Sequence, residues 1–286
     1  MGNFAIHPLA SIDLQTDVLL YFSLIVRRKR MTHGEFDMME QSDLTAGQER
    51  LTDMHAHILY GVDDGARTKE ESIELVRMAM RQGVRRIVAT PHYAPEIPGQ
   101  HTLLLRRLEE TRALLRSNGL HIPLEQGNEV LYFDSIPEHL RDGRILTLGG
   151  TRAVLIEFYP AENWNRMLQA VRRIMDAGFV PVLAHVERYQ ALYQNDPDEL
   201  RLEGAYLQIN ADSLEGNIFS ARARFCKRLL LNGRTDFVSS DMHRSDVRPP
   251  RFQKAVRWIR AHLPKAEADA VLYENAERLL RSSRIS

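Results

Sequence analysis

Residues 52–80 read TDMHAHILYGVDDGARTKEESIELVRMAM and contain the first unit of a pattern that runs through the rest of the chain. The opening six residues, 52–57, predict a short β-strand. Thr68 and Glu71 have the spacing of a helix-starting capping box. The apolar residues of 73–80 then recur at helical spacing, so this stretch predicts a strand, a loop and an amphipathic helix.

The same order of strand and helix repeats toward the C-terminus. The predicted strands are 52–57, 86–92, 125–132, 153–158, 180–185, 206–210 and 237–243. Further helices are predicted at 103–115, 167–177, 221–231, 252–263 and 266–280, and Gly83, Gly119, Gly178 and Gly233 stand just past helix ends, where a left-handed cap is expected. Seven strands that alternate with helices predict an α/β fold with a parallel sheet, either open or closed.

Potential metal ligands stand at the ends of six of the seven predicted strands. They are His55, His57, His92, Glu129, Glu157, His185, Asp241 and His243, and Asp64 follows in the loop after the first strand. Because the carboxyl ends of parallel strands meet at one edge, residues distant in sequence are expected to converge there.

This set holds five imidazoles and four carboxylates, which is more than the four to six ligands of one transition-metal ion. It therefore predicts two or three ions bridged by carboxylates. Each residue alone has an ordinary structural explanation, such as a hydrogen-bonded histidine or a turn at Asp63 and Asp64. The set as a whole does not, since crowding these groups together is costly without cations.

A cluster of divalent ions suits hydrolysis at phosphorus. Such ions lower the pKa of a bound water to about 7 and hold the oxygens of an in-line displacement, and a mixed N/O ligand set suits Mn, Fe, Zn or Co. Arg188 and Arg248 are candidate phosphate-binding residues, because the guanidinium fork donates two parallel hydrogen bonds. The alternatives are a surface residue at a helix start for Arg188 and a solvated loop charge for Arg248. Asn210 is a candidate contact to a ligand or to substrate.

Composition narrows the function classes. The chain has 286 residues, 44% hydrophobic and 27% charged, with 38 basic and 38 acidic side chains. Zero net charge with no evident basic stripe disfavours nucleic-acid binding. The single cysteine, Cys226, excludes a disulfide framework and predicts a reducing, cytoplasmic location. The Cys-x5-Arg pattern of thiol-dependent phosphatases is absent at Cys226, because Asn232 occupies the arginine position.

Residues 1–50 differ from the remainder, which at 51–286 is predicted to form one domain. Their apolar run at 18–26 is too short for a membrane span, which needs about 20 residues. Basic residues 27–30 follow the run, whereas a secretory signal places them before it. We predict a poorly ordered extension, or a true start further along the chain. The alternative is a weak interfacial anchor, without firm membrane insertion.

Seven segments of the chain carry a resemblance to a known family. They are Asp53-Met54-His55-Ala56-His57, Gly61-Val62-Asp63-Asp64-Gly65 with Thr68-Lys69-Glu70-Glu71-Ser72, Ala89-Thr90-Pro91-His92, Gly127-Asn128-Glu129, Ile156-Glu157-Phe158, Ala184-His185-Val186-Glu187-Arg188-Tyr189, and Ser240-Asp241-Met242-His243 with Arg248-Pro249-Pro250. In this order they resemble the PHP (polymerase and histidinol phosphatase) superfamily. More narrowly, they resemble the bacterial CpsB/CapC-type, manganese-dependent protein-tyrosine phosphatases of capsule and exopolysaccharide loci.

The resemblance implies a distorted (β/α)7 TIM-like barrel of the PHP type with a trinuclear manganese centre. It implies one ion near His55, His57, Glu129 and Asp241, a second near Glu129, Glu157 and His185, and a third near Asp64, His92 and His243. It also implies that Arg188 and Arg248 bind the phosphate while a metal-bound hydroxide attacks phosphorus. The implied partner is a bacterial tyrosine autokinase with a tyrosine-rich tail. The alternatives are a small-molecule phosphoesterase such as histidinol-phosphate phosphatase and a non-catalytic kinase-binding barrel. The first fifty residues depart from the family pattern.

Overall fold

Two parallel β-sheets lie at the centre of the computed structural model, which describes residues 49–216 and 219–281. The first sheet has the order β1 (Leu51–Ala56), β2 (Val84–Ala89), β3 (Leu124–Gln126). The second has the order β4 (Glu129–Leu131), β5 (Ala153–Glu157), β6 (Val180–Leu183), β7 (Tyr206–Asn210), β8 (Phe237–Ser239). All the paired strands are parallel, which confirms the predicted α/β class.

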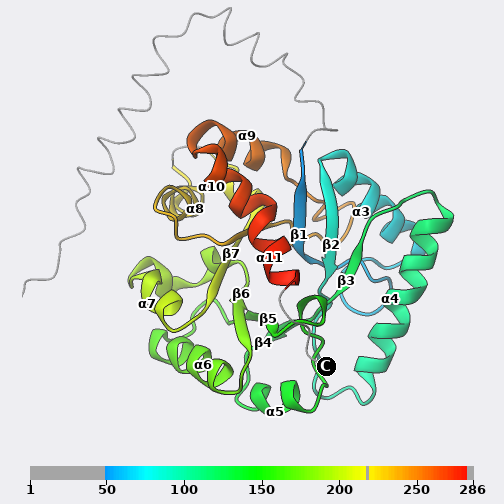
Figure 1. The fold of residues 1–286 in the computed structure, drawn as a ribbon, viewed down its shortest axis with the longest axis horizontal. Helices are drawn as coiled ribbons and strands as arrows, with labels where there is room; N and C mark the ends of the chain where they lie inside the picture. The colour runs from blue at the N-terminus through cyan, green and yellow to red at the C-terminus, as the bar shows by residue number, and fades with distance from the viewer. Residues whose placement is uncertain (1–48, 217–218, 282–286) are drawn as a thin grey trace, which may run out of the picture. The chain divides into compact units, whose positions relative to one another are not determined.

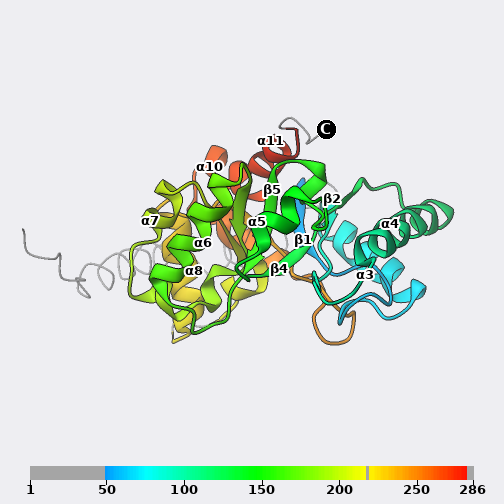
Figure 2. The same ribbon diagram turned by 90° about the horizontal axis from the view of Figure 1, so that it is seen from below.

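Helices surround the strands in both views (Figures 1 and 2). They are α3 (Lys69–Arg81), α4 (Gln100–Ser117), α5 (Ile136–Arg141), α6 (Trp164–Asp176), α7 (Pro197–Leu202), α8 (Ala221–Leu231), α9 (Gln253–His262), α10 (Lys265–Asp269) and α11 (Asn275–Arg281). β1, β5 and β8 are almost entirely buried, as expected for parallel strands covered by helices. Among the described residues, no helix has the length and apolar character needed to cross a membrane.

The two sheets adjoin at two single bridges. Ala56 bridges Met242, and His92 bridges Glu129. Backbone hydrogen bonds accompany them, from His57 N to Met242 O at 2.8 Å and from Tyr93 N to Glu129 O at 2.8 Å. These bridges bring the end of β1 next to the loop after β8, and the loop after β2 next to the start of β4.

The predicted start of α3 is largely confirmed. Thr68 Oγ1 accepts a hydrogen bond from Glu71 N at 3.2 Å, as a capping box requires. The carboxylate of Glu71 accepts from Arg67 N at 2.9 Å instead of from Thr68 N. The four glycines predicted past helix ends all have positive φ, between 65° and 98°, because only glycine enters this region without steric cost.

The predicted strand at 125–132 is wrong, since Gly127 and Asn128 divide it into β3 and β4. A Cβ atom on Gly127 would lie 2.9 Å from Leu148 Cδ2, so the chain passes too close for a side chain there. The Asn128 side chain donates to Pro91 O and accepts from Leu146 N, in place of a strand partner. The chain thereby leaves the first sheet and enters the second.

Several other predicted boundaries also need correction. β1, β2, β5, β6 and β8 end earlier than predicted. His55 and Glu157 still lie within their strands, whereas five predicted ligands stand in the loops that follow: His57, His92, His185, Asp241 and His243. The predicted helix 266–280 contains a π-helical turn, Ala270–Glu274, between α10 and α11. The short helices α5 and α7 were not predicted, because six residues are too few for a clear period. Apart from 49 and 50, the predicted extension 1–50 lies outside the described residues.

Candidate metal centre

All nine predicted ligand residues lie in one cluster at the carboxyl ends of the strands. Three sets have potential ligand atoms that all lie within 4.8 Å of one another. These sets are His55, His57, Glu129 and Asp241; His57, Asp64, His92 and His243; and His92, Glu129 and Glu157. His185 is brought to the third set, since its Nε2 lies 2.8 Å from Glu129 Oε1 and 3.6 Å from Glu157 Oε2.

Glu129 is the centre of the cluster. Its carboxylate is buried and contacts four imidazoles, at 3.2 Å for His55, 3.1 Å for His57, 3.3 Å for His92 and 2.8 Å for His185. Burial alone would raise the pKa of Glu129, but the charge of His55 and the hydrogen bond from His185 hold the pKa well below its ordinary value. Glu129 is therefore ionised, and its carboxylate could bridge two cations.

Asp241 uses its two carboxylate oxygens differently. Oδ2 accepts hydrogen bonds from Arg188 at 2.6 Å, Asn210 Nδ2 at 2.8 Å and Arg248 at 3.3 Å. Oδ1 is buried without a hydrogen-bond partner, although His55 Nε2 lies 3.3 Å away. The two arginines therefore stand on one side of this carboxylate, and an unsatisfied oxygen faces the cluster.

These contacts test whether a metal ion fits the cluster. The Nε2 atoms of His55 and His57 face each other at 3.2 Å, and the orphaned Asp241 Oδ1 lies near both. Buried polar atoms without partners are costly, and a divalent cation would satisfy all three at once. Imidazole nitrogens with carboxylate oxygens are ligands that Mn, Fe, Zn and Co accept. The residues present fit metal ions.

The electrostatics of the carboxylates point the same way. Burial and the negative charge of Glu129 raise the pKa of Glu157 to about 7. Burial and the charge of the stacked His57, whose ring centroid lies 3.8 Å away, lower the pKa of His243 to about 4. Burial is the largest cause of both shifts. Cations would relieve the repulsion between the Glu157 and Glu129 carboxylates, and a neutral His243 ring has a lone pair to offer a cation.

Two backbone conformations in the cluster are strained. His185 has φ 32° and Asp241 has φ 52°, and among the described residues they are the non-glycine residues with positive φ. Each such conformation costs about 1–3 kcal/mol and persists only where the surroundings enforce it. Strain on two members of one cluster indicates that their side-chain directions are fixed by tertiary contacts.

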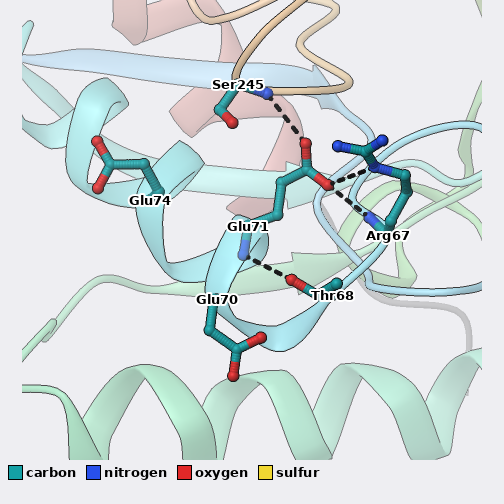
Figure 3. Close-up of a pocket in the computed structure, with 6 residues that line it drawn as sticks. All are labelled: Arg67, Thr68, Glu70, Glu71, Glu74 and Ser245. Carbon is teal, nitrogen blue, oxygen red and sulfur yellow. Dashed lines mark hydrogen bonds and ion pairs between the residues drawn. The ribbon is translucent and has the colours of Figure 1, made fainter.

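The mouth of the cluster reaches solvent. The side chain of Asp64 is 71% exposed, and those of His92 and Arg248 are each 39% exposed. Beside it lies a hollow of about 540 Å³ between the start of α3 and the loop after β8 (Figure 3), lined by Arg67, Thr68, Glu70, Glu71, Glu74 and Ser245. Glu71 joins these two parts, because its Oε1 accepts from Ser245 N at 3.3 Å. The helix start thus tethers the loop that carries Arg248.

Sequence reasoning missed three polar residues that support the cluster. Asp63 Oδ2 lies 2.8 Å from His57 Nδ1, and Gln208 Oε1 lies 3.2 Å from His55 Nδ1. Asp53 accepts from Ser240 N at 2.9 Å and so ties β1 to the end of β8; its burial raises its pKa to about 6. The sequence held a signal for each of them. Asp63 and Asp53 stand within two residues of predicted ligands, and Gln208 shares a strand face with Asn210.

The other histidines that the structure describes, and the cysteine, stand apart from the cluster. His139 Nδ1 pairs with Tyr93 Oη, and His262 Nδ1 with Trp258 O. His7 and His33 lie outside the described residues. Cys226 is buried within α8, and burial raises the pKa of its thiol well above the ordinary value. A neutral, enclosed thiol is a poor nucleophile.

Replacement of Cys226 by Ser is therefore expected to leave hydrolytic turnover within about twofold of the original protein. Burying a hydroxyl in place of the thiol costs roughly 1–3 kcal/mol, so thermal stability falls while turnover per folded molecule does not. Steady-state kinetics and thermal unfolding measure the two quantities. A loss of turnover without unfolding would show that the thiol takes part in the chemistry.

Comparisons with known proteins identify the family of this chain. Residues 51–281 match the family model for capsular polysaccharide synthesis, CpsB/CapC. The tyrosine-protein phosphatase CpsB of Streptococcus agalactiae serotype V is 34% identical over 246 residues, which cover 82% of this chain and 100% of that protein. The tyrosine-protein phosphatase YwqE of Bacillus subtilis is 32% identical over 242 residues, covering 82% and 93%.

Solved structures give the same answer at the level of the fold. A chain reported with YwqE from Bacillus subtilis and CpsB from Streptococcus pneumoniae, described as unique metal-dependent tyrosine phosphatases, superposes with a TM-score of 0.75 at 30% identity. The match covers 82% of this chain and 96% of that one. A β-aspartyl dipeptidase of Fervidobacterium islandicum, with a TM-score of 0.52 at 17% identity over 80% of this chain and 72% of its own, shares the fold alone. The predicted resemblance is confirmed, and the chain belongs to the CpsB/CapC family of capsular polysaccharide synthesis.

Proposed function

We propose that this protein is a metal-dependent protein-tyrosine phosphatase that regulates capsule or exopolysaccharide synthesis. The carrying observation is the convergence of nine imidazole and carboxylate side chains, with Arg188 and Arg248 beside them, at one open mouth. Relatives at 34% and 32% identity are named tyrosine-protein phosphatases. The two sheets would form one distorted (β/α)7 barrel through the bridges at Ala56 and His92. A crystal structure with these two edges apart would contradict the barrel.

The proposed metal ligands are the nine predicted residues, His55, His57, Asp64, His92, Glu129, Glu157, His185, Asp241 and His243. The proposed metal is manganese, two or three ions, with Fe, Zn or Co as alternatives that share its ligand preferences. When bound, such ions would activate a water for attack and polarise the phosphoryl oxygens. Metal analysis of the purified protein tests both the identity and the number of ions.

Within this proposal the protein's own residues bind and orient the substrate. Arg188 and Arg248 would hold the outer oxygens of the phosphate, since both guanidinium groups reach the mouth and Asp241 Oδ2 fixes them from behind. The leaving phenolate has an unperturbed pKa near 10, so its departure makes little demand on a general acid. No thiol nucleophile is required.

Turnover of a phosphotyrosine peptide compared with histidinol phosphate tests the substrate class. The solvent-exposed Asp64 and His92 side chains favour a protein segment over a small enclosed substrate. Preference for histidinol phosphate would support a small-molecule phosphoesterase, and tight peptide binding without phosphate release would support a non-catalytic barrel. We also propose that residues 51–286 carry the activity and 1–50 form an extension. A chain that begins at Ala46 should then match the full chain in the same assay.

The proposed partner is the tyrosine-rich tail of a bacterial tyrosine autokinase, and the proposed location is the cytoplasm, where the kinase obtains ATP. Loss of phosphotyrosine from such a tail on addition of the protein would support the partner. Cell fractionation tests the location, and recovery of the protein outside the cytoplasm would contradict it.

Metal binding is expected to release protons and to strengthen as the pH rises from 6 to 8. Burial alone would lower the pKa of both His57 and His55. Hydrogen bonds with Asp63 and Glu129 nevertheless raise the pKa of His57 well above the ordinary value, and the charge of Glu129 raises the pKa of His55. The metal-free protein therefore holds protons at neutral pH that a metal must displace, so affinity increases with pH. Calorimetric titration in two buffers of different ionisation enthalpy measures the released protons. Equal affinity at pH 6 and 8 would contradict this.

A further inference from the structure

Neither β7 nor the loop directly after it contributes any of the nine candidate ligands, yet the buried β7 residue Gln208 touches two of them. Gln208 Oε1 lies 2.9 Å from His185 N and 3.2 Å from His55 Nδ1. Its Nε2 lies 2.9 Å from Asn210 Oδ1. The side-chain amide of Gln208 therefore contacts His55 near the end of β1, His185 just after β6, and Asn210 on its own strand.

The backbone N–H of His185 fixes the direction of each of these hydrogen bonds. The N–H of His185 can only donate, so the Gln208 atom that it meets must be the carbonyl oxygen. The same oxygen can only accept from His55, so Nδ1 of that ring carries the proton. In the neutral ring the lone pair of His55 is thereby left on Nε2, the atom that faces Glu129 Oε2 at 3.2 Å and Asp241 Oδ1 at 3.3 Å.

The second contact of Gln208 bears on the backbone of His185. This residue has φ 32°, a conformation that L side chains rarely adopt. The hydrogen bond to Gln208 Oε1 occupies its N–H in that conformation, and the ring is then directed at Glu129 Oε1 at 2.8 Å. Without the Gln208 oxygen this buried N–H would have no partner to offset the strained turn.

The third contact passes to Asp241. Because Gln208 Nε2 donates to Asn210 Oδ1, the Asn210 amide must present its Nδ2 to Asp241 Oδ2, and it does so at 2.8 Å. Asn210 therefore helps to hold the oxygen opposite the unpartnered Oδ1. Gln208 therefore contacts two candidate ligands directly, His55 and His185. It is linked to a third, Asp241, through Asn210.

We infer that Gln208 is the positioning residue of the metal centre: it sets His55 to offer Nε2 and holds His185 in its left-handed backbone conformation. This rests on the proposed metal site but not on the proposed substrate. Outer hydrogen bonds of this kind change metal affinity by about 10- to 100-fold.

Gln208→Met is the main test, because it keeps the length of the side chain and removes both the acceptor and the donor. Mn²⁺ affinity, measured by calorimetry on the full chain, is expected to fall by about 10- to 100-fold. Gln208→Glu keeps the acceptor oxygen and should rescue affinity to within several-fold of the original. Gln82→Met is the matched control: Gln82 also bridges buried backbone groups, Pro250 O and Phe252 N, but touches no candidate ligand. The Gln82→Met protein should be less stable than the original but should bind Mn²⁺ with unchanged affinity.

The ring ¹⁵N shifts of His55 give a readout that needs neither metal nor activity. In the metal-free, unmutated protein at a pH where the ring is neutral, the shifts should report a proton on Nδ1, and in Gln208→Met they should report a mixture. A proton on Nε2 in the unmutated protein would overturn the inference, even if the Met variant failed to fold. So would unchanged Mn²⁺ affinity in a folded Gln208→Met. If the unmutated protein bound no metal at all, the proposed function would fail instead, while the ¹⁵N shifts would still decide the role of Gln208.

Discussion

Replacement of Glu129 by Gln should lower phosphatase turnover by roughly a thousandfold or more and reduce bound metal with it. The Glu129 carboxylate contacts His55, His57, His92 and His185, and it belongs to two of the three sets of potential ligand atoms. An amide has the same shape but no charge, so it cannot bridge two cations. Metal ions supply several kcal/mol of transition-state stabilisation, and each 1.36 kcal/mol is a factor of ten in rate.

Glu125→Gln is the matched control for this experiment. Glu125 stands on β3, four residues earlier, and pairs with Arg86 at 2.6 Å outside the cluster. Turnover and metal content should both stay near the original values in this variant. Elemental analysis and steady-state kinetics on both proteins decide the matter. Full turnover by a metal-depleted Glu129→Gln protein would refute the proposed metal chemistry.

Replacement of Arg188 by Lys should lower turnover by about a hundredfold while metal content stays near normal. Arg188 Nη2 donates to Asp241 Oδ2 at 2.6 Å, and its partly exposed guanidinium leaves further N–H groups for a phosphate. Lysine keeps the positive charge but cannot form the planar, two-bonded contact with the phosphate. A loss of about 2–3 kcal/mol from one transition-state contact corresponds to this factor.

Arg172→Lys provides the comparison at an arginine of the surface. Arg172 lies on α6 and pairs with Glu203 at 2.6 Å, away from the cluster. Since an exposed ion pair contributes about 0–1 kcal/mol, this change should affect neither turnover nor metal content. If Arg188→Lys lost its metal together with its activity, the residue would belong to the support of Asp241 and its assignment to phosphate binding would be wrong.

The sequence predicted the α/β class and the membership of the cluster for a physical reason. Strand and helix periods are local, and the carboxyl ends of parallel strands meet at one edge, so the sequence alone predicts that residues such as His55 and His185 lie together. The break at Gly127 was not predictable in the same way. Gly127 lies against the side chains of Leu148, Thr90 and Val88, which are 20 or more residues away along the chain, so no local pattern records this packing.

What the sequence by itself determined is the α/β pattern, the family motifs and the nine side chains that gather at the mouth. Only the tertiary structure decided how they are held: the left-handed turns at His185 and Asp241, the two separate uses of the Asp241 oxygens, and the contact of Gln208 with His55 Nδ1. These features depend on hydrogen bonds between strands that are far apart in sequence. Gln208 lies 153 residues from His55, and no local pattern records that the two side chains meet.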